Sequence, residues 1–397
     1  MDQSRKNVPD YLWYRLPEEY SEYLNPQSDA FLAASLLGAM HFGEDIEVQG
    51  STSPQLAYNL EEYQYLARFN FPKLLKPVSV KYEQLSTINR KANFVGTSFS
   101  GGVDSLFTLK SHLPDFQNNP DYQITHAVFI RGFDILPHES GYYDSLFYQY
   151  EKQLINLGIK LIEVETNIVS LTHQRLNFSN FYGPQIVSAA LILSGLFQRY
   201  FIPSSGDYEL LRTASSTANP LMDRLLTNGA TQIIHHGSTH TRSEKIEAIA
   251  DWKTAQKLLW VCLEANSKEA TWNCSRCEKC MRTMIPLYSL AKLVNFKTFD
   301  KPFTRNWDLI RYSRKYKQTY NFAKEFLPFI QRTNKKLLPW IIITNFMGTF
   351  RSLIIKYLPG SIKVFLRRFG YFKPRNDSAN AYEVPEVSQL IKKSYDY

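Results

Sequence analysis

Residues 93–113 read NFVGTSFSGGVDSLFTLKSHL and join a strand pattern, a turn and a helix pattern without a gap. The apolar run 93–99 predicts a buried strand, and residues 103–113 predict an amphipathic helix. Between them, Gly101 and Gly102 let the backbone turn tightly and approach a ligand without obstruction by a Cβ atom. Amides at the start of a helix point toward a bound anion. This stretch therefore predicts a phosphate-binding loop between a strand and a helix.

The polar side chains of this loop suit a nucleoside triphosphate and its metal ion. Ser100 and Ser105 offer hydroxyl donors, and Asp104 is placed to help hold the Mg²⁺ that accompanies ATP. The Walker pattern is excluded, because no Gly-Lys-Ser/Thr sequence follows the glycines.

The six residues SGGVDS at positions 100–105 resemble the SGGxDS signature of the PP-loop superfamily, also called N-type ATP pyrophosphatases or adenine nucleotide alpha hydrolases. The resemblance implies that this loop binds the pyrophosphate part of ATP and that AMP is transferred to a substrate oxygen. The implied loop residues are Ser100, Gly101, Gly102, Val103, Asp104 and Ser105. It also implies that adenine lies against the backbone at the end of the next strand, HAVFIRGFD, which makes Phe129, Ile130 and Gly132 candidates. Asp134 in the same stretch is equally well explained as a turn residue.

Strand and helix patterns alternate along the chain after residue 93. Strands are expected in THAVFIRG, KLIEVETN, RYFIPSS and TQIIHHGS, and helices in YYDSLFYQYEKQLINLG, YGPQIVSAALILSGLF and TRSEKIEAIADW. This alternation predicts an α/β fold with a doubly wound parallel sheet of the adenine nucleotide alpha hydrolase type. Within 182–197, apolar residues at helical spacing predict a helix packed on the sheet: Ile186, Ala189, Ala190, Leu193, Leu196 and Phe197.

Three regions are expected along the chain. Residues 1–88 form a small α/β lobe with helices in DAFLAASLLGAMHF and SPQLAYNLEEYQYLARF and strands in DIEVQG and KPVSVKY. Residues 89–295 form the ATP pyrophosphatase domain with the cysteine cluster described below. Residues 296–397 form a basic segment of helices, which we expect to break at Pro328, Pro339 and Pro359.

All four cysteines of the chain fall between residues 262 and 280. Cys274, Cys277 and Cys280 share the pattern CxxCxxC, and Cys262 can close a tetrahedron around one ion. Four thiolates in such a cluster favour a closed structural Zn²⁺ site over a disulfide framework. An iron–sulfur cluster uses the same ligands and stays as the alternative.

The SGGVDS loop together with this cysteine pattern resembles 7-cyano-7-deazaguanine synthase and its relatives over residues 93–293. That family converts a carboxylate to an amide and then a nitrile, using ATP and ammonia beside a structural zinc. The resemblance implies ATP activation and zinc for this chain.

Polar residues that follow the predicted strands are candidates for the substrate site, because ligands bind at the carboxyl edge of a doubly wound sheet. They are Ser204, Ser205, Asn219, Asp223, His235, His236, His240, Arg242 and Lys245. Arg242 and Lys245 are the predicted catalytic cations alongside Asp104 and Ser105, since they can stabilise negative charge on the α-phosphate or on a substrate carboxylate. A solvated helix start explains the two cations equally well, and structural roles are favoured for the two adjacent histidines. Three cations in or next to the cysteine turn can face the same cleft or simply be solvated: Arg276, Lys279 and Arg282.

The net charge of +9 belongs to the C-terminal segment. Residues 326–376 contain ten Lys or Arg and no Asp or Glu. Apolar runs between these charges predict either a docking surface for an anionic partner, such as a carrier protein, a membrane surface or RNA, or a helical cap over the sheet. No basic start with an apolar run begins the chain, and no apolar run reaches the ~18 residues of a spanning helix, so a cytoplasmic protein is expected.

The expected chemistry is adenylation of a substrate carboxylate or carbonyl oxygen with release of pyrophosphate, followed by displacement of AMP by ammonia or an amine. The substrate is expected to be a small molecule or bound to a carrier. The first alternative is a tRNA-thiolating enzyme, which the basic segment favours. The second is a subunit that binds nucleotide without catalysis.

Overall fold

The computed structural model describes residues 11–133, 140–169, 178–213, 216–262, 272–302, 306, 309 and 319–343. Its centre is a sheet of six strands in the order β1-β6-β5-β4-β7-β8. The strands are β1 (Tyr14–Arg15), β4 (Phe94–Ser98), β5 (His126–Arg131), β6 (Lys160–Thr166), β7 (Phe197–Pro203) and β8 (Gln232–His236). All neighbours pair in parallel except β1, which is antiparallel to β6. The expected α/β class with a mostly parallel sheet is therefore confirmed.

The strand order reverses at β4. The chain passes from β4 outward to β5 and β6, and then returns to the other side of β4 to form β7 and β8. In doubly wound sheets, such a reversal opens a crevice at the carboxyl ends of the strands. The phosphate-loop sequence follows β4 directly, so the topology places it at this point.

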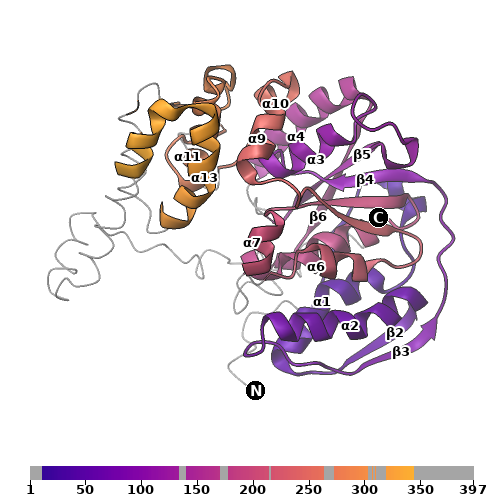
Figure 1. Cartoon of the computed structure of the whole chain (residues 1–397). Helices are drawn as coiled ribbons and strands as arrows, with labels where there is room; N and C mark the ends of the chain where they lie inside the picture. Colours follow the sequence, from indigo (N-terminus) through magenta and orange to yellow (C-terminus); the bar gives the residue numbers. More distant parts are fainter. Residues whose placement is uncertain are drawn as a thin grey trace.

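Helices cover both faces of the sheet (Figure 1). One face packs against α3 (Val103–Ser111), α4 (Ser140–Leu154), α9 (Arg242–Ile249) and α10 (Lys253–Leu258). The other packs against α1 (Asp29–Phe42), α2 (Pro54–Asn70) and α6 (Phe178–Leu191). Alternate residues of one strand serve the two layers, as Phe129 and Val128 of β5 show. Shorter elements are η2 (Glu18–Tyr23), η3 (Pro120–Tyr122), η4 (Ile155–Leu157), α7 (Tyr208–Thr213), α8 (Pro220–Asp223), η5 (Arg224–Leu226), η6 (Leu293–Asn295) and η7 (Lys335–Leu337).

The N-terminal lobe contains the four elements expected from its sequence: α1, β2 (Ile46–Thr52), α2 and β3 (Val80–Leu85). β2 and β3 form a separate two-stranded parallel sheet. The apolar side chains of α1 and α2 belong to the same buried cluster as α6 and the near face of the six-stranded sheet. Buried Asp29 adds a polar link, because its carboxylate accepts hydrogen bonds from the Ser53 amide at 2.9 Å and from the Asn228 side chain at 2.8 Å. The lobe thus shares its core with the larger sheet.

Two local expectations were wrong. The helix expected through residue 197 ends at Leu191, and Phe197 is the first residue of β7. Helical spacing continues through the turn, but Gly195 packs so tightly against Tyr23 that a Cβ there would lie 2.7 Å from the Tyr23 carbonyl oxygen. Pro328 does not break a helix, because it lies inside α13 (Thr319–Thr333). Its buried neighbours Phe329 and Ile330 anchor that helix in the core, which offsets the backbone hydrogen bond that proline cannot make.

The described part of the C-terminal segment packs on the domain. α13 lies beside α11 (Glu278–Ser289), as Figure 1 shows, and Phe326 and Leu337 join the same buried cluster as α9 and α11. Arg332 forms an ion pair with Glu247 of α9 at 2.6 Å. Residues 319–343 therefore act as a helical cap, and Pro359 and the basic residues after 343 lie outside the described residues. Within the described residues, no helix has the length and apolar character needed to cross a membrane.

Candidate functional site

The predicted phosphate loop, residues 100–105, is a tightly packed turn between β4 and α3. Gly101 has φ +73°, and a Cβ atom on it would lie 2.0 Å from the Tyr150 hydroxyl oxygen. That hydroxyl donates a hydrogen bond to the Ser100 carbonyl at 3.3 Å. Glycine is therefore required at 101 for both its backbone angle and its lack of a side chain. Gly102 then caps the N-terminus of α3.

The two serines of the loop hold the loop itself. The Ser105 hydroxyl donates to the Gly102 carbonyl at 3.1 Å and accepts from the Ser100 amide at 3.3 Å. The Ser100 hydroxyl accepts from the Gly102 amide at 3.3 Å. Ser105 is buried, whereas Ser100 is partly exposed. To bind a ligand, these two hydroxyls would have to give up the hydrogen bonds that they form within the loop.

Asp104 is the centre of a charged cluster that joins α3 to α9. Arg242 Nη1 lies 2.8 Å from one carboxylate oxygen of Asp104, and Lys245 Nζ lies 3.2 Å from the other. A capping box between Thr241 and Glu244 starts α9 immediately before the two cations and so fixes the turn that carries them. The structure thus brings Asp104 together with Arg242, which is 138 residues away in the sequence, and with Lys245, which is 141 residues away.

Burial and charge act in opposite directions on Asp104. Burial raises the pKa of this carboxyl, but the charges of Lys245 and Arg242, the Lys245 hydrogen bond and the charge of Arg282 together hold its pKa below the ordinary value. Asp104 is therefore ionised at neutral pH. Of the three cations in or next to the cysteine turn, Arg282 on α11 contributes to this lowering, whereas Arg276 and Lys279 are exposed.

Lys245 is the most deeply buried cation of the cluster, with a side-chain exposure of 1%. Its ammonium group also donates to the Ser204 carbonyl, at the end of β7, at 2.5 Å. One lysine therefore connects the carboxyl ends of β4 and β7, the two strands between which the crevice is expected. The Ser204 hydroxyl itself is used locally, since it donates to the Gly206 carbonyl at 2.6 Å.

The other polar candidates after β7 and β8 have structural partners. Asn219 caps α8 by accepting from two backbone amides, and Ser205 contacts the Tyr182 hydroxyl at 2.8 Å. His235 Nδ1 lies 2.6 Å from the carboxylate of buried Asp223, whose pKa is raised by burial. These side chains are not drawn into the Asp104 cluster.

The other two candidate histidines, His236 and His240, contact α3, the helix that follows the loop. His236 Nδ1 lies 3.1 Å from the Thr108 hydroxyl on α3, and burial, reinforced by the charges of His112 and Lys245, lowers the pKa of His236 to about 3. His240 packs against Phe107 with ring centroids 4.9 Å apart. The structural role favoured for His235 and His236 agrees with these contacts.

The candidates for the adenine side differ from one another. Phe129 is buried and stacks on Tyr143 with ring centroids 4.7 Å apart, and Ile130 packs against the opposite layer. The side chains of Phe129 and Ile130 therefore pack in the two layers of the core, and only their backbone groups lie along the edge of the strand. Gly132 has φ +113°, and a Cβ there would lie 2.0 Å from the Thr166 carbonyl oxygen, so glycine is required where β5 ends. Asp134 lies outside the described residues.

The four cysteines converge on one buried point. Their sulfur atoms all lie within 4.8 Å of one another, with Sγ–Sγ distances of 4.0 Å for Cys274–Cys280 and 3.8 Å for Cys262–Cys277. A tetrahedral zinc with Zn–S bonds of about 2.3 Å requires sulfur atoms about 3.8 Å apart. Backbone amides of Cys274, Cys277 and Cys280 donate to the sulfurs of neighbouring cysteines at 3.3–3.5 Å, which suits thiolates. The cluster can hold a metal ion such as zinc.

Two residues of this region were missed by the sequence analysis. Trp260 donates its backbone N–H to the Gly101 carbonyl at 2.9 Å, and buried Asn273 bonds to the backbone on either side of Trp260. Their position next to Cys262 and Cys274 was the only available signal, because neither residue type is typical of a metal site.

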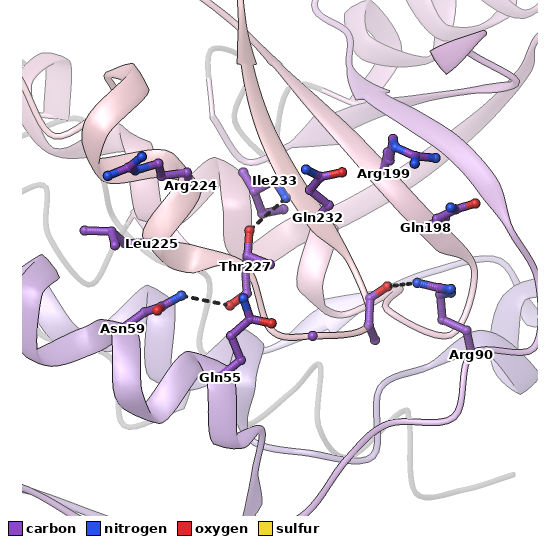
Figure 2. Close-up of a pocket in the computed structure, with 12 residues that line it drawn as sticks. Gln55, Asn59, Arg90, Gln198, Arg199, Arg224, Leu225, Thr227, Gln232 and Ile233 are labelled. Atoms are coloured by element: carbon purple, nitrogen blue, oxygen red, sulfur yellow. Dashed lines mark hydrogen bonds between the residues drawn. The ribbon is translucent and has the colours of Figure 1, made fainter. Parts of the chain in front are cut away.

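A separate pocket of about 560 Å³ lies at the other edge of the sheet, at the amino ends of β7 and β8. Figure 2 shows that Arg224 and Arg199 extend toward opposite sides of it, while Arg90 donates to the Ala230 carbonyl at 2.5 Å. Arg199 donates to the Asp121 carbonyl at 3.0 Å. Four residues of β7 lie between Arg199 and Ser204, so the five steps along the extended strand span about 17 Å. The pocket is therefore distinct from the Asp104 cluster.

Comparison with known protein families, with curated proteins and with solved structures finds no match to this chain.

Proposed function

We propose that the chain is an ATP pyrophosphatase-type ligase with a PP-loop fold. It adenylates a carboxylate or carbonyl oxygen of a small or carrier-bound substrate and passes the activated group to ammonia or an amine, as 7-cyano-7-deazaguanine synthase-like enzymes do. The observation that carries the proposal is the SGGVDS loop at the strand reversal, with its carboxylate held between two cations.

The loop supplies the groups that a triphosphate requires. The start of α3 directs amides toward an anion at the carboxyl edge of β4. In the proposed complex, the positive charges of Arg242 and Lys245, which now face Asp104, would stabilise the pentavalent α-phosphorus. Asp104 offers carboxylate oxygens for Mg²⁺, which would neutralise charge on the phosphates when bound. Contact with that ion would replace at least part of the present Asp104 ion pairing.

In the proposed reaction the substrate oxygen attacks the α-phosphorus and the bond to the β-phosphate oxygen breaks, so pyrophosphate leaves. The amine then attacks the acyl carbon of the adenylate, loses a proton and expels AMP. No side chain of the chain has to form a covalent bond, so catalysis depends on positioning and on charge stabilisation.

The thiolation alternative is disfavoured by the cysteine cluster. All four cysteines of the chain meet at one buried point, so none stands apart to carry sulfur. Zinc as the bound ion is part of the proposal, and its role there is to stabilise the fold.

The test is to supply ATP and Mg²⁺ with a panel of carboxylates and to measure exchange of labelled pyrophosphate into ATP. We expect exchange with some carboxylates, and we expect Asp104→Ala and Ser105→Ala to abolish it, with a loss for Asp104→Ala of at least about 10²-fold. Asp115→Ala is the matched control, because Asp115 is exposed just beyond α3. Formation of ADP in place of AMP, or full exchange by Asp104→Ala, would refute the proposed function.

A further inference from the structure

A short segment, residues 259–262, lies between the phosphate loop and the cysteine cluster. The backbone N–H of Trp260 donates to the Gly101 carbonyl at 2.9 Å. Two residues later the same segment supplies Cys262, the ligand that comes from outside the CxxCxxC turn. Any displacement of this segment is therefore passed to Gly101, whose backbone is already confined by Tyr150.

Asn273 fixes this segment in place. Its side-chain oxygen accepts from the Val261 amide at 2.8 Å, and its side-chain nitrogen donates to the Leu259 carbonyl at 2.8 Å and to the Thr298 carbonyl at 3.2 Å. Asn273 is fully buried, with an exposure of 0%, and directly precedes Cys274. One side chain thus joins the residues on both sides of Trp260 to the start of the CxxCxxC turn.

The helix α11 also begins at this cluster. Cys277 caps its N-terminus, and the charge of Arg282 on the same helix contributes to the lowered pKa of Asp104. The direct hydrogen-bonded link between the cysteine region and the loop is the one from Trp260 to Gly101.

We propose that Asn273 is a positioning residue that sets the geometry of the phosphate loop through the Trp260–Gly101 hydrogen bond. This inference rests on the proposed function, since it assigns a determinant of ATP affinity at the same site. The physical reason is that loop amides stabilise phosphate only when they are already aligned, and a displacement of about 1 Å at such a site can cost about 10²-fold. Asn273 is neither a residue of the loop nor one of the four cysteines, so its effect is indirect.

The test compares Asn273→Ala with Asn228→Ala. Asn228 is a matched control because it is also buried and also holds several groups, including Asp29 at 2.8 Å and the Thr231 amide at 2.9 Å, but it lies at the N-terminal lobe. Both variants should lose stability. Only Asn273→Ala should raise the Kd of an ATP analogue with a methylene between the α- and β-phosphates, by about 10- to 100-fold. Hydrogen exchange at residues 100–103 should accelerate in that variant alone, with the metal content unchanged.

Asn273→Asp provides a second variant if Asn273→Ala does not fold. It is nearly isosteric and retains the acceptor for the Val261 amide, but it loses both amide donations, so it should accelerate exchange in the loop as well. An unchanged Kd and unchanged exchange would overturn the proposal, as would an equal effect of Asn228→Ala or loss of metal from the Asn273 variants. If the wild-type protein binds no ATP analogue, the proposed function fails. Hydrogen exchange at residues 100–103 would then still show whether Asn273 holds the loop in position.

Discussion

The two edges of the six-stranded sheet both collect cationic side chains, but the contacts of these side chains differ. At the carboxyl edge, Arg242 and Lys245 converge on the carboxylate of Asp104 at 2.8 and 3.2 Å. At the amino edge, a pocket of about 560 Å³ is lined by three arginines that do not converge (Figure 2). Arg90 and Arg199 are each committed to a nearby backbone carbonyl.

The difference shows that the pocket and the convergence of charged side chains lie at different places in this fold. The carboxyl edge gathers the ends of β4 and β7 and the start of α3 at the strand reversal, so amides and charged side chains point at one place. At the amino edge, Gln55 from the first turn of α2 and Arg224 from η5 line the pocket, without the convergence of charges seen at Asp104. Variants at the two edges should show whether activity depends on the charged cluster at the carboxyl edge.

The largest effect is expected for Gly101→Ala, compared with Gly229→Ala in the amino-edge pocket. Both glycines have positive φ, +73° and +86°, so alanine strains the backbone at both sites by about 1–3 kcal/mol. Only at Gly101 would the new Cβ overlap another atom, the Tyr150 hydroxyl. We expect Gly101→Ala to lower pyrophosphate release by at least about 10²-fold, whereas Gly229→Ala should lose stability alone.

Pyrophosphate release and thermal unfolding of the two glycine variants provide the measurement. Equal losses of activity would show that general destabilisation, and not the loop, controls turnover. The carboxyl edge would then have no special role in turnover compared with the amino edge.

A smaller effect is expected for the four-cysteine cluster, which could hold a metal ion. Cys277→Ser should reduce the zinc content from about one ion per chain and should lower the free energy of unfolding by several kcal/mol, because structural zinc contributes folding energy directly. Arg224→Ala in the amino-edge pocket is the control and should change stability by less than about 0.5 kcal/mol. Elemental analysis and denaturant unfolding measure both; stoichiometric iron and sulfide in the wild type would contradict the choice of zinc.

The smallest effect concerns two histidines at opposite edges, half-buried His236 on β8 and buried His126 on β5. Burial lowers the pKa of His236 to about 3 and that of His126 to about 4, whereas both are near 6.5 when exposed. Between these values the unfolded chain binds a proton that the folded chain does not. Stability must therefore fall as the pH falls, by at most about 1.4 kcal/mol per pH unit for each histidine.

Unfolding free energies measured from pH 7 to pH 3 should separate the two sites. His236→Gln should flatten the slope from pH 6.5 down to about 3, and His126→Gln only down to about 4. Retention of the wild-type slope in both variants would show that other groups control acid sensitivity.

The sequence alone determined the features that depend on neighbours along the chain. The strand before Ser100, the glycines and α3 follow from local apolar spacing and backbone freedom, and the CxxCxxC turn follows from residue spacing. The parallel sheet followed from the alternation of strands and helices, because helices must cross between parallel strands. Arg242 and Lys245 could be named as candidates because they follow a predicted strand.

Only the tertiary structure decided which of those candidates meet. Asp104 and Lys245 are 141 residues apart, and their contact depends on the order of strands in the sheet, which spacing along the chain does not encode. The role of Asn273 was also hidden in the sequence, because its hydrogen bonds go to backbone groups, which every residue type has. The helix around Pro328 depends on packing as well, because α13 accommodates this proline where Phe329 and Ile330 are buried. Local sequence sets each element, whereas packing between distant elements selects the side chains that form the site.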